Sequence, residues 1–288
     1  MFTCYLFGID RQVYYRKIRR KINKQSKAEQ VVSMVIEIRK SMPRLGTKKL
    51  YYLLSDKLQL IKIGRDKFFD ILRANHLLIQ PKRSYHITTN SHHRFRKHQN
   101  QILDLEINRP EQVWVSDITY IVKREKPCYL SIITDAYSKK IMGYYVADNL
   151  NTESGLKALR TAIKQRKNKD LPLINHSDRG LQYCANDYQS ILNKNGILTS
   201  MTQNSNPYEN AVAERINGIL KQEFMIDKYN QDLYIMKRIV KEAINTYNVQ
   251  RPHYSNYMLT PNQMHLQKQI KMRTYKTKNN SKLLITTV

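Results

Sequence analysis

Three acidic residues stand where a carboxylate needs a partner. Asp117 interrupts the apolar segment "VWVSDITYIV", where both β propensity and the cost of burying an unpaired charge disfavour an aspartate. Asp178 directly follows the apolar run "LPLINHS", and Glu214 lies among apolar residues at helical spacing in "PYENAVAERINGILKQEF", on a face that we expect to be half-buried. Taken singly, Asp178 fits the start of a turn and Glu214 fits a solvated helix.

Taken together, the three carboxylates predict a metal site. If the strand with Asp117 and the strand before Asp178 are neighbours in one sheet, the two aspartates lie side by side, and a helix against that edge brings Glu214 to them. Three carboxylates at one point repel unless a divalent cation lies between them, and such oxygen ligands suit Mg²⁺ or Mn²⁺. Two such ions activate a nucleophile and stabilise the leaving oxygen of a phosphoryl displacement. We therefore expect a protein that cuts or joins nucleic acid.

The charge of the chain points to the same partner. The 288 residues include 50 Lys and Arg against 23 Asp and Glu, a formal net charge of +27, which argues for a polyanion. Residues 1–100 hold 23 basic and 6 acidic residues, a net charge of +17, and residues 101–288 hold 27 and 17, a net charge of +10. A solubilising surface explains part of the lysine content but not this asymmetry, so we expect the first third to bind phosphates more strongly.

Other classes of protein fit the sequence less well. No run approaches the ~18 apolar residues of a membrane span. The start "MFTCYLFGID" has neither a basic n-region nor a cleavage site, so we expect a soluble, cytoplasmic protein. The three cysteines, at positions 4, 128 and 184, have neither disulfide nor metal-ligand spacing, so we expect Cys4, Cys128 and Cys184 to be ordinary reduced thiols. Four histidines suggest zinc, but no cysteine lies near them and a solvated basic linker fits better; they are His86, His92, His93 and His98.

The first 80 residues are expected to form a basic, helix-turn-helix-like DNA-binding region. Asp10 would cap a short helix in "GIDRQVYYRKIRRKINKQ", and a second helix follows in "KAEQVVSMVIEIRKSM". A glycine opens each of two further helical segments, "GTKKLYYLLSDKL" and "GRDKFFDILRANHLL". A bundle that merely packs on its neighbour has the same pattern, and both interpretations stay open. A polar, basic stretch then breaks the periodicity, so residues 81–108 are predicted to be a linker.

Residues 109–265 are predicted to be a catalytic core of the α/β class. Three β-rich segments joined by short turns, "QVWVSDITYIV", "CYLSIITDAY" and "KIMGYYVAD", predict an antiparallel meander. A helix in "NTESGLKALRTAIKQRK", a strand in "LPLINHS", a helix in "NDYQSILNKNG" and a strand in "ILTSM" follow. This order predicts a mixed sheet covered by helices. Residues 266–288, with six basic residues and no acidic one, are a basic tail that is expected to be flexible or bound to nucleic acid.

These segments resemble a known family. The chain is similar to insertion-sequence transposases with a retroviral-integrase-type (DDE) core, specifically the OrfB product of the IS-three family, in "VWVSDITYI", "HSDRGLQY" and "NPYENAVAERINGILKQE". Thirty-five residues separate Asp178 from Glu214, as in the family, and Lys221 stands at the family's basic position seven residues further on. "GIDRQVYYRKI", "MPRLGTKKLYYLL", "GRDKFFDILRANHLL" and "YNVQRPHYSNYMLTPNQMH" resemble its N- and C-terminal regions. Ser205 and Glu209 replace a usual Gly and Asp.

The resemblance implies an RNase-H-like fold: a mixed five-stranded sheet flanked by helices and preceded by a small all-α domain. It implies that Asp117, Asp178 and Glu214 bind two Mg²⁺ or Mn²⁺ ions and catalyse cleavage at the element's ends, followed by strand transfer from the new 3′ hydroxyl. It implies a DNA contact at Lys221. Further motif positions, expected to contact DNA or support the site, are Trp114, His176, Arg179, Gly180, Tyr183, Asn206, Pro207, Asn210 and Arg215.

The expected partners are DNA with terminal inverted repeats, target DNA, and further copies of the chain. The resemblance adds the upstream-frame (OrfA) product or a frameshift fusion with it, and a bacterial, nucleoid-associated setting. One alternative is a catalytically silent DNA-binding regulator or remnant of a mobile element, which predicts loss of a triad member, whereas all three are present. Another is a host RNase-H-like nuclease, which has no reason to carry the N-terminal helical segments or the "RPH" block.

Overall fold

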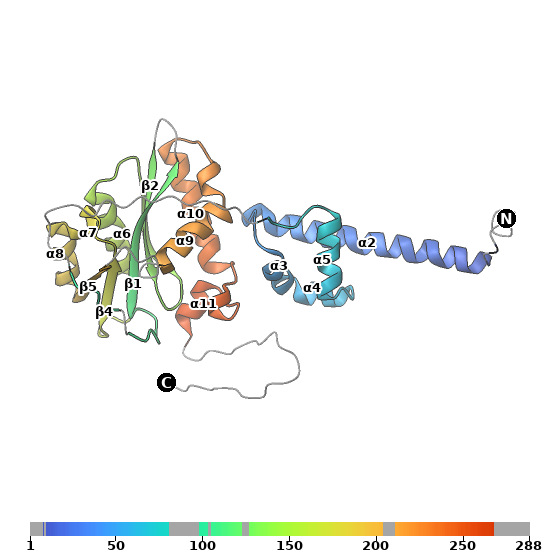
Figure 1. Cartoon of the computed structure of the whole chain (residues 1–288), viewed down its shortest axis with the longest axis horizontal. Coiled ribbons are helices and arrows are strands. Elements are labelled where there is room, and N and C mark those ends of the chain that lie inside the picture. The colour runs from blue at the N-terminus through green and yellow to red at the C-terminus, as the bar shows by residue number, and fades with distance from the viewer. Residues whose placement is uncertain are drawn as a thin grey trace. The chain divides into compact units, whose positions relative to one another are not determined.

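The computed structural model describes residues 8, 10–80, 98–102, 105–122, 127–203 and 211–267. The chain divides into two compact units, Met1–Pro81 and Lys82–Val288, and the blue and cyan helices of Figure 1 form the first. Within the described ranges, no helix combines the length and apolar character that a membrane crossing requires.

The first unit is helical, as the sequence predicts. Its helices are α2 (Arg11–Ser41), α3 (Thr47–Leu53), α4 (Ser55–Leu60) and α5 (Arg65–Ala74). The Asp10 side chain caps α2 by accepting a hydrogen bond from the Gln12 backbone N–H at 2.6 Å. The expectation of two helices between residues 11 and 42 is wrong, because neither Gly nor Pro interrupts this stretch and α2 continues through all 31 residues.

The two halves of α2 differ in their surroundings. Val31 and Val35 in the second half are buried, and this half packs against α5. Residues 11–26 are all exposed, and they carry basic residues without an acidic one. The first half of α2 therefore presents positive charge to solvent.

The second unit is built on a mixed sheet of five strands. The strands are β1 (Val113–Val122), β2 (Cys128–Asp135), β3 (Ile141–Ala147), β4 (Leu173–Ser177) and β5 (Ile197–Met201), in the order β3-β2-β1-β4-β5. The first three pair antiparallel, whereas β4 pairs parallel to both β1 and β5. The predicted meander and the predicted mixed sheet are both confirmed.

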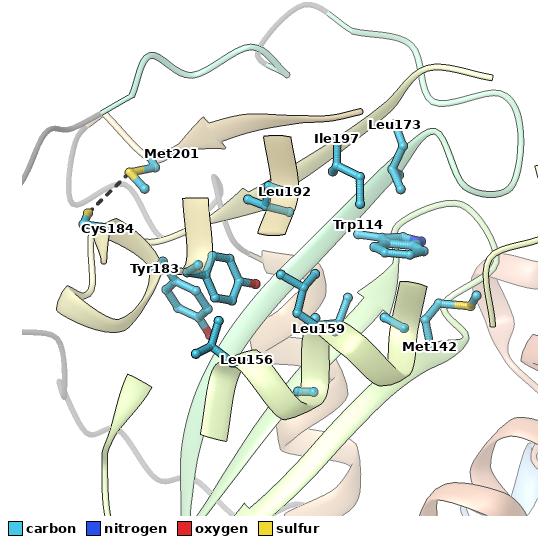
Figure 2. Close-up of a cluster of buried hydrophobic side chains, with 14 residues drawn as sticks. Trp114, Met142, Leu156, Leu159, Leu173, Tyr183, Cys184, Leu192, Ile197 and Met201 are labelled. Atoms are coloured by element: carbon cyan, nitrogen blue, oxygen red, sulfur yellow. Dashed lines mark hydrogen bonds between the residues drawn. The ribbon is translucent and has the colours of Figure 1, made fainter. Parts of the chain in front are cut away.

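One face of the sheet is covered by three helices. They are α6 (Thr152–Gln165), α7 (Leu181–Cys184) and α8 (Asn186–Lys194). Trp114 of β1 is fully buried there among side chains such as Leu159 and Leu192 (Figure 2). Gly143 permits α6 to approach, since a Cβ at this position would lie 2.2 Å from the Ala158 carbonyl oxygen. This face is a packed core, and each fully buried leucine contributes about 1.5–3 kcal/mol.

The other face of the sheet receives α9 (Ala211–Gln222). Ala213 packs with Val113 and Val115, which point away from Trp114 because side chains alternate along a strand. Further along the chain are the short 3-10 helices η2 (Ile226–Lys228) and η3 (Tyr254–Asn256), with α10 (Leu233–Val249) and α11 (Pro261–Leu266). Figure 1 shows α9, α10 and α11 on the same side of the sheet.

Candidate active site

The parallel pairing of β1 with β4 places the two aspartates side by side. Ser116 is in register with Ser177, so Asp117 on β1 and Asp178, which directly follows β4, each occupy the next position along the chain. Residues in register on parallel neighbours point to the same face of the sheet. The aspartates therefore meet at the carboxyl end of β4, where open α/β sheets hold ligands.

The loop after β4 fixes the Asp178 carboxylate. Its Oδ1 accepts a hydrogen bond from the Gly180 backbone N–H at 3.0 Å. A Cβ at Gly180 would lie 2.9 Å from the same oxygen, which is closer than real Cβ contacts. Gly180 thus leaves room for the carboxylate in its present orientation.

Helix α9 contacts the same stretch of β1 through two polar side chains. Asn217 Nδ2 donates to Asp117 Oδ2 at 2.6 Å, and Lys221 Nζ donates to Thr119 Oγ1 at 2.5 Å. Four helical residues rise about 6 Å and two strand residues about 6.6 Å, so the two contacts match when helix and strand run in the same direction. Glu214 lies one turn before Asn217 and shares its face.

The pKa of Asp117 is raised by its surroundings. Burial and the charge of Asp178 raise it to about 7, against the hydrogen bond from Asn217, and the charge of Glu214 adds to the rise. Desolvation also raises the pKa of Glu214. In the absence of a cation, the site therefore resists holding all of its negative charge.

Glu214 differs from the expectation. Its side chain is exposed, not half-buried, because it lies in the first described turn of α9 while the apolar residues of the helix turn inward from Ala213 and Ile216. Within the described ranges, no three carboxylate, imidazole or thiol groups form a set that could hold a metal by themselves. Asp117 and Asp178 form the close pair, and Glu214 stands near it.

The residues present nevertheless fit a divalent cation. All three candidate ligands are carboxylates, the oxygen donors that Mg²⁺ and Mn²⁺ prefer. The pKa of Asp117 is raised by burial first and by the charge of Asp178 second, and a cation beside the two carboxylates would favour their charged forms. A set of protein ligands that leaves coordination positions free suits an ion that also binds phosphate oxygens.

Comparison with known proteins gives a family. Residues 107–207 match a family model described as "Integrase core domain", and residues 195–261 match a second model with the same description. The "Insertion element IS600 uncharacterized 31 kDa protein" of Shigella sonnei is 33% identical over 257 residues, which cover 87% of this chain and 92% of that protein. The chain belongs to the IS-three family of insertion-sequence transposases.

Other members of this family align over shorter stretches. The transposase for IS904 of Lactococcus lactis is 34% identical over 54% of this chain and 60% of its own length. Transposase InsF for IS3A of Escherichia coli is 32% identical over 56% of each chain, so the chain spans a little over half the length of both. The HTLV-2 integrase catalytic core domain in complex with magnesium is 19% identical, with a TM-score of 0.44, over 55% of this chain and 97% of that chain.

Family membership makes the chain a polynucleotidyl transferase of the integrase superfamily, with the RNase-H-like sheet described above. Two of the motif positions lie inside the core of the sheet. Trp114 and His176 are both fully buried, and His176 Nδ1 lies 2.9 Å from Ser200 Oγ. Neither side chain reaches the surface, so of the two expected roles, contact with DNA and support of the site, their burial fits only the second.

The remaining motif positions divide by exposure. Arg215 is exposed and Arg179 is half-buried beside Asp178, whereas Tyr183 is buried and packs edge-on against Tyr188 with ring centroids 5.3 Å apart. Three further positions lie outside the described residues: Asn206, Pro207 and Asn210.

Sequence reasoning missed Asn217 and Thr119. Asn217 donates to the Asp117 carboxylate, and Thr119 accepts from Lys221. A signal was present, since Asn217 lies on the same helical face as Glu214 and Lys221, and Thr119 lies on the same strand face as Asp117. The sequence alone does not place α9 on β1, and the pairing follows only from that placement.

Proposed function

We propose that this chain cleaves DNA at the ends of its insertion element and joins the freed 3′ hydroxyl to target DNA. The observation that carries the proposal is the pairing of Asp117 with Asp178 under the polar face of α9. In-line attack on a phosphodiester needs concentrated negative ligands for metal and nearby positive groups for phosphate. The site has both, because Lys221 donates a hydrogen bond to Thr119, two residues along β1 from Asp117.

Asp117, Asp178 and Glu214 would hold two Mg²⁺ or Mn²⁺ ions. Ions bound at such a site lower the pKa of water and stabilise the oxygens that attack and leave. Asn217 holds Asp117 in one orientation by its hydrogen bond at 2.6 Å. The Gly180 backbone N–H does the same for Asp178. The protein thus orients its ligands before DNA arrives.

The proposed partners and organisation follow from charge and family. Residues 1–80 bind DNA, residues 81–108 link this region to the catalytic core of 109–265, and the tail from 266 is basic. The core acts as an oligomer that brings two DNA ends together, with the upstream-frame product as a further partner. The cellular location that fits this work is the cytoplasm, at the nucleoid.

Strand cleavage and joining on labelled DNA with the element's own terminal repeats test this proposal. With Mg²⁺, the wild-type chain should join 3′ ends to target DNA, and Glu214→Gln should lower the rate at least ~100-fold because a ligand charge is lost. Glu242→Gln, on an exposed part of α10, is the matched control and should leave the rate unchanged.

The alternative functions give different results in the same assay. Binding without chemistry, with the upstream product added, would contradict the proposal and identify a regulator or remnant. Cleavage without joining, on any DNA substrate, would identify a nuclease. The proposal requires metal-dependent joining that Glu214→Gln removes while DNA binding persists.

A further inference from the structure

The C-terminal signature of the chain has no role in the site described so far. It includes Arg251, Pro252 and His253, the "RPH" block, which follows α10. Arg251 is one of the largest fully buried side chains in the described part of the chain, with 1% exposure. A guanidinium is costly to bury, so its partner should explain why it is there.

That partner is Glu223, at the C-terminal end of α9. Arg251 Nε donates to Glu223 Oε2 at 2.8 Å, and Arg251 Nη2 donates to Glu223 Oε1 at 2.7 Å. The pair is therefore bidentate, which fixes direction as well as distance. The guanidinium also stands over the Tyr247 ring, 5.6 Å from its centroid, and Nη1 donates to the Pro252 carbonyl oxygen at 3.3 Å.

Glu223 lies directly after α9 and continues its last turn, since its backbone N–H donates to the Ile219 carbonyl at 2.8 Å. It lies nine positions after Glu214, about two and a half helical turns. Glu223 therefore projects from the side of the helix opposite to Glu214. The side that faces β1 carries Asn217 and Lys221. Helix α9 is therefore held by β1 on one side and by Arg251 on the other.

The C-terminal block is itself attached to the turn between β2 and β3. Tyr247 Oη donates to the Lys139 carbonyl at 2.8 Å. Asn248 donates to the Ile141 carbonyl and accepts from the Ile141 N–H, both at 3.0 Å. Asn256 Nδ2 donates to the Ser138 carbonyl at 2.6 Å. These hydrogen bonds fix the residues around Arg251 to the same sheet that holds Asp117.

We propose that Arg251 and Glu223 are positioning residues that set where α9 lies on β1. The C-terminal signature connects the β2–β3 turn to the C-terminal end of α9. This connection holds the helix in the position that places Glu214 beside the aspartate pair. This inference rests on the proposed function for its catalytic consequence, but the placement of α9 is a property of the metal-free chain.

Hydrogen exchange of the full chain, without metal or DNA, tests the placement directly. Arg251→Lys keeps the charge but loses the bidentate fork, and it should raise amide exchange in α9 about 10-fold while α6 stays within about twofold. Glu223→Gln, at a side chain with 20% exposure, is a milder variant and should act in the same direction.

Arg166→Lys is the matched control. Arg166 is another buried arginine, and it donates to the Asn195 and Leu171 carbonyls at 3.2 and 2.6 Å. It follows α6, on the opposite side of the sheet from α9. The control should raise exchange near α6 and leave α9 unchanged, which separates positioning of α9 from a general loss of stability.

Joining kinetics supply the second readout. At saturating DNA, Arg251→Lys should lower the joining rate about 10-fold or more with a DNA Kd within about twofold of wild type, because misplacement affects chemistry more than binding. The double variant with Glu223→Gln should be no slower than Arg251→Lys alone, since both remove one interaction.

Two results would overturn the inference. One is wild-type exchange in α9 for both Arg251→Lys and Glu223→Gln. The other is a rise in amide exchange that is equal in α6 and α9 for Arg251→Lys, and likewise equal in both helices for Arg166→Lys. If the wild-type chain failed to join DNA, the proposed function would fail, but the exchange data would still decide whether the pair positions α9.

Discussion

At the scale of the residue, Asp117 carries opposing demands. Its carboxylate must stay close to Asp178 to share an ion, yet its burial and the charge of Asp178 raise its pKa to about 7. Asn217 offsets part of the cost by donating a hydrogen bond. Such a residue lowers the stability of the metal-free protein and is expected where function requires it.

Asp117→Asn should therefore stabilise the metal-free protein. Between pH 4 and 7 the folded state keeps a proton that the unfolded state releases, so wild-type stability falls as pH rises through this range. The amide removes this loss and still accepts from Asn217. Solvent reaches the half-buried carboxylate, so we expect a gain of about 1–2 kcal/mol at pH 8 and none near pH 3.5.

Urea unfolding at the two pH values measures the difference. Asp187→Asn, at an exposed position of α8, should show no such gain. A variant at Asp117 that is equally or less stable than wild type at pH 8 would show that the aspartate pair is not under electrostatic strain.

Gly180→Ala should impair the site without unfolding the protein. The new Cβ would lie 2.9 Å from Asp178 Oδ1, so the carboxylate must turn away, and joining should fall about 10-fold. Gly180 has φ −63° and ψ 144°, which alanine adopts freely, so the melting temperature should change little.

Gly218→Ala is the control for this variant. An added Cβ at Gly218 in α9 meets nothing within 4 Å, and alanine favours a helix by about 0.5–1 kcal/mol. Its joining rate should match wild type. Equal rates for the two alanine variants would contradict the role given to Gly180.

At the scale of the element, the sequence predicted the strands far better than the side-chain contacts. The alternation in residues 112–148 and the apolar runs before Asp178 and at residues 197–201 were enough for the five strands. The continuity of α2 through residues 11–41 is not evident from the sequence, because most of its first half is polar or basic. The pairs Asn217–Asp117 and Arg251–Glu223 join residues far apart in the chain, and no local pattern encodes them.

Helix α11 is attached by a buried ionic cluster that also gives a pH-dependent prediction. His265 Nε2 lies 3.4 Å from Glu111 Oε1, and its Nδ1 lies 3.0 Å from Ser138 Oγ. Burial alone would lower the pKa of His265, but its bonds to Asp135 and Glu111 outweigh this and raise it. The stabilisation from the charged ring is complete below the ordinary value of 6.5 and is lost as pH rises through the raised pKa.

His265→Gln should therefore cost most at low pH. At pH 6 it removes the imidazolium from two buried carboxylates, and we expect a loss of about 2 kcal/mol or more in the free energy of unfolding. At pH 9 the difference from wild type should narrow. Denaturant unfolding at both pH values measures this, with the exposed His76→Gln as control; a loss that does not depend on pH would contradict the ionic account.

At the scale of the whole molecule, positive charge is concentrated in the first hundred residues. Arg16, Arg19 and Arg20 lie on the exposed half of α2. If they bind phosphates, replacing all three with Gln should make the dependence of log K on log salt shallower, by up to ~0.9 for each phosphate that the variant no longer binds. DNA binding at several salt concentrations measures the slope.

The control for charge alone uses three exposed lysines of the catalytic unit, Lys164, Lys169 and Lys194. Their replacement with Gln removes the same charge and should change the slope less. Equal changes for the two triple variants would show that the first unit has no special part in DNA binding.

A metal switch at Asp178 tests the central claim most directly. A cysteine there exchanges an oxygen ligand for a softer sulfur, which Mg²⁺ binds poorly and Mn²⁺ tolerates better. We predict that Asp178→Cys lowers the rate of strand joining in Mg²⁺ at least ~100-fold. In Mn²⁺ the rate of the same variant should be about 10-fold higher or more than in Mg²⁺, while wild type works with both ions. Undiminished joining by Asp178→Cys in Mg²⁺ would contradict the account, because Asp178 would then hold no metal that takes part in the reaction.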